Sequence, residues 1–288
     1  MWMGSRHAGI ALAAAALLAI AAVACHQRTQ PVESSARPRV VSLHDVTTEI
    51  VVALGAVDRL VGVAGSVELP REVESAVAGL SRTGGTESIV ALRPSVVLGT
   101  KVIAERSPDL VAFLRKSGID VFLAEPAKLD DVYTLVTEVA RRTGVPAAGV
   151  ALAARLRARA GIEAASKPDP MRVLVYDCCD PPFTAAGRTV LSDLIRRAGG
   201  RNVFADLDSG WTKVSWEDVL ARRPQMVVIH SYHYDGQEDV EEKRRRLHRI
   251  PGLADVPVTV MPLGLSLGGI RSVDALIHLR QAIGGVRG

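Results

Sequence analysis

Histidine, cysteine and tyrosine side chains gather where the predicted buried strands end. In parallel α/β sheets, ligands bind just beyond the carboxyl ends of the strands, so these positions are candidates for a binding site. Imidazole and thiolate are the side chains that zinc, copper, nickel and cobalt prefer as ligands. We therefore predict a site for a metal, or for the metal of a chelate, that comprises His44, Asp45, Lys101, Cys178, Cys179, His230, Tyr232, His233 and Arg271.

Two modes of metal binding fit this set, and the sequence leaves both open. In one mode the protein binds a metal ion directly through His44, Cys178, Cys179, His230 and His233. In the other, a histidine or Tyr232 supplies an axial ligand to the metal of haem or a corrinoid, and Lys101, Arg188 or Arg271 contacts carboxylates of the solute. A remote alternative is a hydrolase with Cys178 as the nucleophile and His230 or His233 as the base.

The 3 cysteines are too few to cross-link the fold. Cys178 and Cys179 are neighbours in the sequence, so a bond between them joins no distant segments. They are either two thiols or a vicinal disulfide, and a disulfide would remove both as metal ligands.

The first 24 residues predict a secretory signal peptide, with Arg6 before an apolar run that ends at Ala24. Ala22-Val23-Ala24-Cys25 is similar to a bacterial lipobox, which predicts a diacylglycerol on Cys25; ordinary secretion is the alternative. Residues 25–38 are a predicted linker, and no later apolar run is long enough to span a bilayer.

The elements that must position these side chains alternate between apolar strands and helices, which predicts α/β architecture with parallel sheets. A helix predicted from 147 to 165 would span about 30 Å at 1.5 Å per residue, enough to connect two lobes. We predict an N-terminal lobe at 39–143, an inter-lobe helix within 144–167 and a C-terminal lobe at 168–288. The predicted strands are 39–43, 60–63, 95–98, 120–123, 172–176, 226–229 and 258–261, and the other helices are 47–54, 87–92, 108–116, 129–142, 191–198 and a C-terminal helix from 272.

An internal repeat supports this division into two halves. Residues 86–98 align without gaps to residues 216–228, with Glu, Ala, Arg, Pro and Val at matching positions. Each copy reads as a short helix that begins at Glu87 or Glu217, a turn at Arg-Pro and a buried strand.

These features together resemble the periplasmic binding proteins for iron siderophores, haem and cobalamin. The resemblance covers residues 39–285 and rests on the two repeat copies and on Arg39–Leu43, Thr48–Ile50, Ala53–Ala56, Asp58–Val63, Pro182–Ala185, Leu194 and Ala198–Phe204. It implies a receptor, not an enzyme, that has no intrinsic cofactor and binds a ferric siderophore, haem or corrinoid in a cleft between two Rossmann-like lobes joined by one rigid helix. A sensor without transport activity is an alternative from another class.

The resemblance also implies partners. The receptor would be a periplasmic monomer that delivers its solute to the permease and ATPase subunits of an ABC importer in the inner membrane. Glu87 and Glu217 match the positions at which the family pairs with arginines of the permease. Carboxylates in the first turn of a helix also complement its dipole, so a local role for them remains open.

The charge balance of the chain excludes a strongly basic protein. It has 35 Lys and Arg against 31 Asp and Glu, and its composition, 48% hydrophobic and 23% charged, is that of a globular protein. The one basic run, Lys243–Arg246, is interpreted as the solvated face of a helix. We therefore expect no nucleic-acid partner.

Overall fold

The structure, a computed structural model of the chain, describes residues 37–65, 68–161, 169–232 and 239–287. The predicted signal peptide, Cys25, most of the linker and His233 lie outside these residues. The described helices include none that combines the length and the apolar character needed to cross a bilayer.

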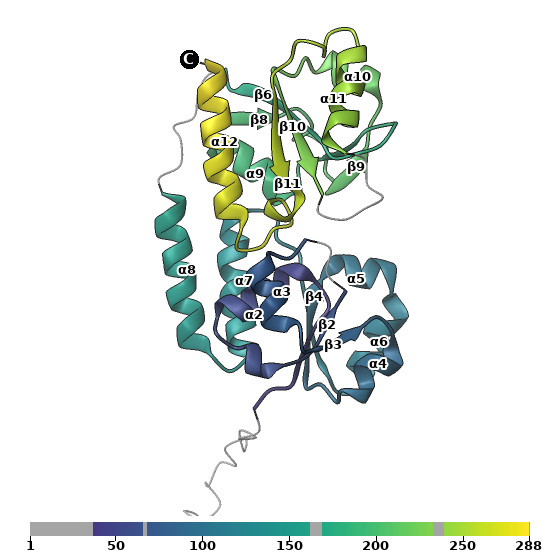
Figure 1. Cartoon of the computed structure of the whole chain (residues 1–288), viewed down its shortest axis with the longest axis vertical. Helices are drawn as coiled ribbons and strands as arrows, with labels where there is room; N and C mark the ends of the chain where they lie inside the picture. The colour runs from purple at the N-terminus through teal and green to yellow at the C-terminus, as the bar shows by residue number, and fades with distance from the viewer. Residues whose placement is uncertain (1–36, 66–67, 162–168, 233–238, 288) are drawn as a thin grey trace, which may run out of the picture. The chain divides into compact units, whose positions relative to one another are not determined.

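The first lobe is built on a five-stranded parallel sheet in the order β3-β2-β1-β4-β5 (Figure 1). Its central strands are runs of buried Val and Leu, as expected for a sheet that is covered on both faces. Its elements are β1 (Val40–Ser42), α2 (Asp45–Ala53), η1 (Val57–Arg59), β2 (Leu60–Ala64), α3 (Arg71–Val77), β3 (Ser81–Thr83), α4 (Thr86–Ala91), β4 (Val96–Thr100), α5 (Lys101–Arg106), α6 (Pro108–Lys116) and β5 (Asp120–Ala124).

The second lobe is built on a four-stranded parallel sheet in the order β11-β10-β6-β8. A two-stranded antiparallel sheet of β7 and β9, which the sequence did not predict, lies beside it. The elements are β6 (Met171–Tyr176), β7 (Phe183–Ala185), α9 (Val190–Arg197), β8 (Gly200–Asn202), β9 (Trp211–Lys213), α10 (Trp216–Ala221), β10 (Met226–Ser231), α11 (Val240–Arg249), β11 (Val258–Pro262), η2 (Leu263–Leu265) and α12 (Ser272–Arg287). The predicted α/β class with parallel sheets is confirmed.

Two helices follow the first sheet in the chain, α7 (Leu129–Arg142) and α8 (Pro146–Ala160). They pack on each other and on α12 of the second lobe (Figure 1). The helix predicted to reach residue 165 ends at Ala160, because Gly161 follows with a φ of 65°, a conformation that glycine adopts without steric cost.

The two repeat copies have the same local structure. Each short helix, α4 or α10, leads into a central strand, β4 or β10, through an arginine with left-handed φ, 47° at Arg93 and 48° at Arg223. A second arginine, which precedes each copy in the chain, donates to the carbonyl of this left-handed residue. Arg39 Nε donates to Arg93 at 3.2 Å, and Arg172 Nε donates to Arg223 at 2.7 Å. The repeat is therefore structural as well as sequential.

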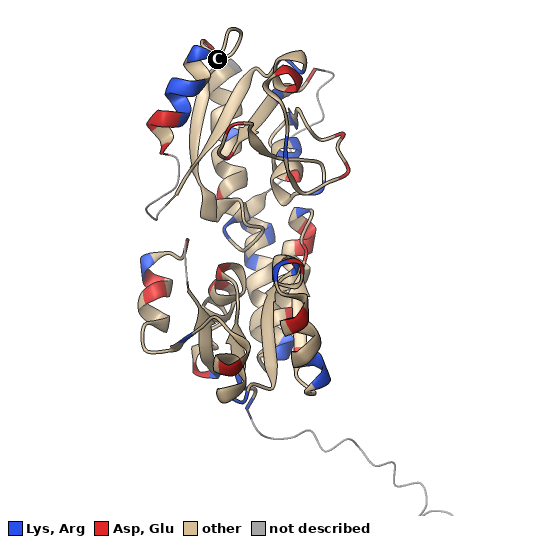
Figure 2. Ribbon diagram, turned by 90° about the vertical axis from the view of Figure 1, so that its right-hand side faces the viewer, with Lys and Arg blue, Asp and Glu red and all other residues tan. Residues whose placement is uncertain are grey.

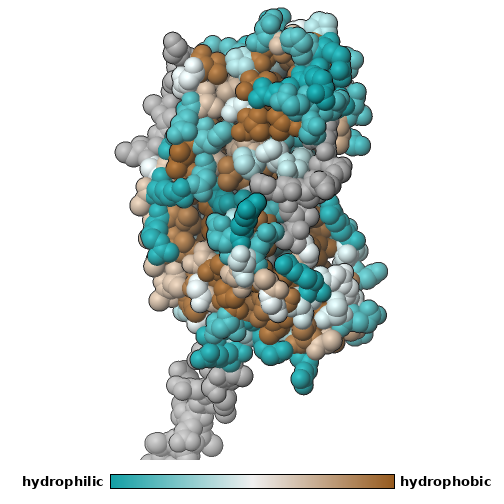
Figure 3. Space-filling view, in the orientation of Figure 1, coloured by the Kyte–Doolittle hydropathy of each residue, from teal (hydrophilic) through white to brown (hydrophobic). Residues whose placement is uncertain are grey.

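Acidic and basic residues are interspersed along the outer helices (Figure 2). On the face shown in Figure 3, apolar residues alternate with hydrophilic ones. One residue of the basic run was interpreted wrongly: Lys243 is not solvated but 0% exposed. Its ammonium donates to the carbonyl of His230 at 2.7 Å and lies 4.4 Å from the ring centroid of Tyr232.

Candidate functional site

Most of the predicted site residues follow the carboxyl ends of the central strands of both sheets; Arg271 lies farther along, just before α12. In the first sheet β1 neighbours β4, and the chain leaves these strands at His44 and Lys101. In the second sheet β6 neighbours β10, and the chain leaves them at Asp177 and Tyr232. In each pair the chain order reverses direction across the sheet, which is where open α/β sheets bind their ligands.

His44 caps the helix that follows β1. Its Nδ1 accepts a hydrogen bond from the backbone N–H of Val46 at 3.2 Å, and burial lowers the pKa of the ring. A neutral imidazole that accepts at Nδ1 carries its proton on Nε2. In this state His44 has a donor at Nε2 and no lone pair there for a metal.

Asp45 and Lys101 are both engaged by protein groups. Asp45 is buried, and its Oδ2 accepts from the backbone N–H of Glu68 at 2.9 Å. Lys101 is exposed and pairs with Glu125, at the end of the neighbouring strand β5, at 2.7 Å. Asp45 therefore fixes the loop after β2, whereas Lys101 retains contact with solvent.

Cys178 and Cys179 form a disulfide with each other, which decides between the two states that the sequence left open. The turn that contains them is held by Tyr176, whose hydroxyl donates to the carbonyl of Cys179 at 3.1 Å, and by Arg246, which donates to the same carbonyl at 3.2 Å. While this bond is intact, neither sulfur is a thiolate. Neither can therefore bind a metal as predicted or act as the nucleophile of the hydrolase alternative.

His230 lies in the middle of a buried hydrogen-bond relay. Its Nδ1 is 2.6 Å from Asp177 Oδ1, its Nε2 is 2.8 Å from Ser266 Oγ, and its side chain is 0% exposed. Burial alone would raise the pKa of Asp177, but its hydrogen bonds to His230 and Tyr232 outweigh this effect and hold the pKa below its usual value. Both ring nitrogens of His230 are thus occupied by protein partners.

The relay has the connectivity of an Asp-His-Ser catalytic triad, but Ser266 is only 5% exposed. Its hydroxyl belongs to the connector of residues 263–271, which joins β11 to α12. The relay therefore fastens this connector to the end of β10.

The other end of the connector binds the first lobe through Arg271. Its guanidinium contacts both carboxylate oxygens of Glu49 in α2, at 2.9 and 2.5 Å, and the carbonyl of Glu68 at 2.6 Å. Burial raises the pKa of Glu49 to about 7, against the hydrogen bond and the charge of Arg271. A side chain at Gly264 would collide with this guanidinium and displace it from its present position.

Glu49 was not among the predicted site residues, although its sequence context carries one signal of its role. Glu49 is the one charged residue in the predicted helix segment 47–54, and a buried carboxylate requires a partner. Arg271 was predicted to contact a solute, but in the structure its guanidinium pairs with Glu49.

Aromatic rings line the same region of the second lobe. Trp211 of β9 stacks on Phe183 of β7 with ring centroids 6.0 Å apart, and its ring lies 5.6 Å from that of His230. Trp216 donates through Nε1 to Asp180 at 3.0 Å. The unpredicted small sheet thus places half-buried rings beside the relay.

The predicted metal-ion ligands do not come together. Over the described ranges, no group of three or more His, Cys, Asp or Glu side chains is arranged to hold a metal ion. His233 lies outside those ranges.

Glu87 and Glu217 lie in the first turns of the matched helices α4 and α10, and both are exposed. The caps come from other residues: Ser215 Oγ accepts from the N–H of Asp218 at 3.0 Å, and Ser88 Oγ accepts from that of Gly85 at 3.2 Å. Neither Glu87 nor Glu217 makes a hydrogen bond or ion pair with another residue in the part of the chain that the structure describes.

Comparison with known proteins gives consistent matches over most of the chain. The model of a family described as periplasmic binding protein matches residues 40–257. The vitamin B12-binding protein of Yersinia pestis (strain Pestoides F) is 30% identical over 200 residues, which are 68% of this chain and 70% of that protein.

Solved structures agree with this match. A periplasmic binding protein from Veillonella parvula has a TM-score of 0.77 at 22% identity and covers 88% of this chain and 93% of its own. The apo periplasmic heme-binding protein from Roseiflexus sp. RS-1 has a TM-score of 0.70 at 26% identity, with 88% of this chain and 100% of its own covered.

Proposed function

Because this chain belongs to the periplasmic binding protein family, we propose that it is the solute receptor of an ABC importer and that its solute is a corrinoid. The corrinoid binds at the carboxyl ends of β1, β4, β6 and β10, between the two lobes. A cobalt ion in a corrin ring already has most of its ligands, so the protein needs to supply few or none.

One observation carries this choice of a chelate over a free metal ion: the candidate donor atoms already have protein partners. The sulfurs of Cys178 and Cys179 are bonded to each other, and both nitrogens of His230 are engaged. Nδ1 of His44 accepts from Val46, which places the ring proton on Nε2. His44 can therefore donate a hydrogen bond to the periphery of a solute, whereas none of these groups offers a lone pair to its metal.

Arg271 and Lys101, the cationic side chains predicted to contact the solute, are both paired with carboxylates of the protein, which favours a corrinoid over haem. The carboxylates of haem call for Arg or Lys, but Arg271 is paired with Glu49 and Lys101 with Glu125. The edge of a corrin ring carries mainly neutral amides, which suit hydrogen-bonding groups such as His44 and Tyr232. The vitamin B12-binding relative supports the same choice, and the heme-binding relative makes haem the second candidate.

The proposed receptor acts in the periplasm, held to a membrane by a lipid on Cys25, and delivers its solute to the permease. Glu87 and Glu217 contact arginines of that permease, a role supported by their exposure at matched positions of the two lobes.

The test is to titrate the purified protein separately with cyanocobalamin, with haemin and with Zn²⁺ or Co²⁺. Calorimetry and visible absorption measure the binding in each titration. We expect one saturable site for cyanocobalamin with a dissociation constant of about 1 μM or lower. Tighter binding of haemin would replace the corrinoid by haem. Binding of the metal ions alone would overturn the chelate proposal.

A pair of variants tests the location of the site. His44→Asn keeps a good helix cap but removes the imidazole, so we expect the affinity for cyanocobalamin to fall about tenfold with little loss of stability. His248→Asn changes an exposed histidine of α11 and serves as the control. Equal affinities of the two variants would argue against binding at the end of β1.

A further inference from the structure

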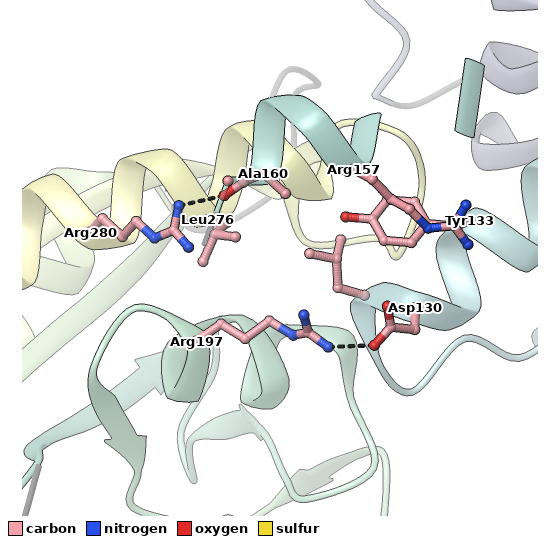
Figure 4. A pocket seen from close by; sticks show the side chains of 9 residues that line it. Asp130, Tyr133, Arg157, Ala160, Arg197, Leu276 and Arg280 are labelled. Carbon is pink, nitrogen blue, oxygen red and sulfur yellow. Dashed lines mark hydrogen bonds and ion pairs between the residues drawn. The ribbon is translucent and has the colours of Figure 1, made fainter. Parts of the chain in front are cut away.

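A cavity lies away from the strand ends, among the four helices α7, α8, α9 and α12. Its volume is about 160 Å³. Its lining includes Tyr133 of α7, Arg157 of α8, Arg197 of α9 and Arg280 of α12 (Figure 4). The cavity therefore joins helices that precede the second sheet in the chain to helices of the second lobe.

The hydroxyl of Tyr133 is the first group that indicates a binding site in this cavity. Tyr133 is only 3% exposed, yet its hydroxyl has no hydrogen-bond partner among the residues that the structure describes. In Figure 4 the hydroxyl points into the space between Arg197 and Arg280. The hydroxyl oxygen is open to the cavity and can therefore donate to a ligand there, and burial of the residue raises the pKa of Tyr133, so the group remains a donor at neutral pH.

Arginines from three helices line the cavity. The guanidinium of Arg157 lies 4.7 Å from the ring centroid of Tyr133 and makes no ion pair with any residue of the described ranges. Arg280 donates to the carbonyl of Ala160 at 2.5 Å, which offsets the negative end of α8.

The lining of the cavity holds more arginines than acidic residues. Arg197 contacts Asp130 at 2.6 Å and Asp193 at 2.7 Å, and Asp130 is the one acidic residue of the lining. The charge of Arg157 is not balanced by them. The cavity is therefore lined by hydrogen-bond donors with an excess of positive charge.

We propose that this cavity binds a small oxyanion, with the Tyr133 hydroxyl and the arginines of α8 and α12 as its donors. Its volume lies below the roughly 300 Å³ at which pockets begin to hold drug-sized ligands, so a phosphate or a short dicarboxylate fits better than a larger molecule. Guanidinium groups bind such oxygens through charge-assisted hydrogen bonds.

A bound oxyanion would connect helices of both halves of the chain, so binding should also raise the stability of the protein. This site is separate from the proposed corrinoid site. Its occupancy can be measured with no corrinoid present, and the two proposals can fail independently.

The test is calorimetric titration of the purified protein with inorganic phosphate and, separately, with succinate, each at constant ionic strength set with sodium chloride. We expect saturable binding of at least one of them at millimolar concentration or below and a parallel rise in the melting temperature. Binding of phosphate alone identifies a tetrahedral oxyanion, and binding of succinate alone identifies a dicarboxylate. No saturable binding of either would overturn the proposal.

Three variants locate the site. Tyr133→Phe removes only the hydroxyl, and Arg157→Gln removes the unbalanced charge; each should weaken binding by about tenfold. Arg155→Gln is the matched control, because Arg155 is exposed on the same helix but does not line the cavity. If Arg155→Gln weakened binding as much as Arg157→Gln, or if neither Tyr133→Phe nor Arg157→Gln weakened it, the binding would be non-specific and the proposal wrong.

Discussion

At the scale of single residues, the chemistry of the site depends on which partners its polar groups already have. Glu49 illustrates this point. It is 4% exposed and faces Arg271, yet burial outweighs the attraction of the guanidinium and raises its pKa to about 7. A carboxyl group with a raised pKa in the folded state binds its proton more tightly there than in the unfolded chain.

This shift predicts a pH dependence of stability. Between pH 4.5 and about 7 the folded protein retains a proton on Glu49 that the unfolded chain has lost, so this group's contribution to the free energy of unfolding falls as the pH rises. The fall is on the order of 3 kcal/mol over the whole window. Glu49→Gln cannot ionise, so it should gain stability relative to the wild type by about this amount between pH 4 and pH 8.

Urea unfolding at a series of pH values measures this difference. Glu74→Gln is the control, because Glu74 is exposed and its substitution should give a difference that does not vary with pH. A constant difference between Glu49→Gln and the wild type over the same pH range would show that the pKa of Glu49 is not raised.

At the scale of elements, the connector of residues 263–271 links the two lobes. Ser266 ties it to His230 at the end of β10, and Arg271 ties it to Glu49 of α2. Gly269 packs against Val46 of the same helix α2. These polar and apolar contacts together set the position of the connector relative to both sheets.

Breaking the relay should cost most where it leaves a buried charge without its partner. His230→Leu removes the imidazole from the buried carboxylate of Asp177, and we expect a loss of about 3–5 kcal/mol in the free energy of unfolding. Ser266→Ala removes one neutral hydrogen bond and should cost about 1 kcal/mol. Chemical denaturation followed by circular dichroism measures both losses.

His278→Leu is the matched control for the relay, since His278 is half-buried and the one hydrogen bond of its side chain within the described residues is to the hydroxyl of Thr259, at 2.9 Å. It should cost about 1 kcal/mol. If His230→Leu cost no more than this control, the relay would not hold the connector as inferred.

At the scale of the whole molecule, the two lobes present matched surfaces. The structural repeat places Glu87 and Glu217 in the first turns of equivalent helices, each followed by a central strand of its sheet. A partner with two similar basic surfaces could bind both at once, as the proposed contact with a permease requires.

The double variant Glu87→Lys with Glu217→Lys tests this contact. We expect uptake of labelled cyanocobalamin by cells to fall at least about tenfold, because like charges at an interface oppose binding, whereas the affinity of the purified protein for cyanocobalamin stays unchanged. Glu74→Lys with Asp255→Lys, two exposed acids of the two lobes, is the control. Normal uptake by the first pair would refute the docking role.

The sequence by itself determined the features that depend on local patterns. Alternating apolar runs and helical segments predicted the parallel sheets, and the copies at 86–98 and 216–228 predicted two similar halves. These predictions succeeded because the periodicity and the turn signals of an element lie within the element itself. For the same reason, the residues that follow each strand could be named in advance.

Only the tertiary structure decided which partners those residues have. Glu49 and Arg271 are 222 positions apart, and His230 meets Asp177 and Ser266 from two other segments. Lys243, which was read as solvated, is buried because α11 packs it against the end of β10. A contact between distant segments depends on how whole elements pack, and no local pattern encodes it.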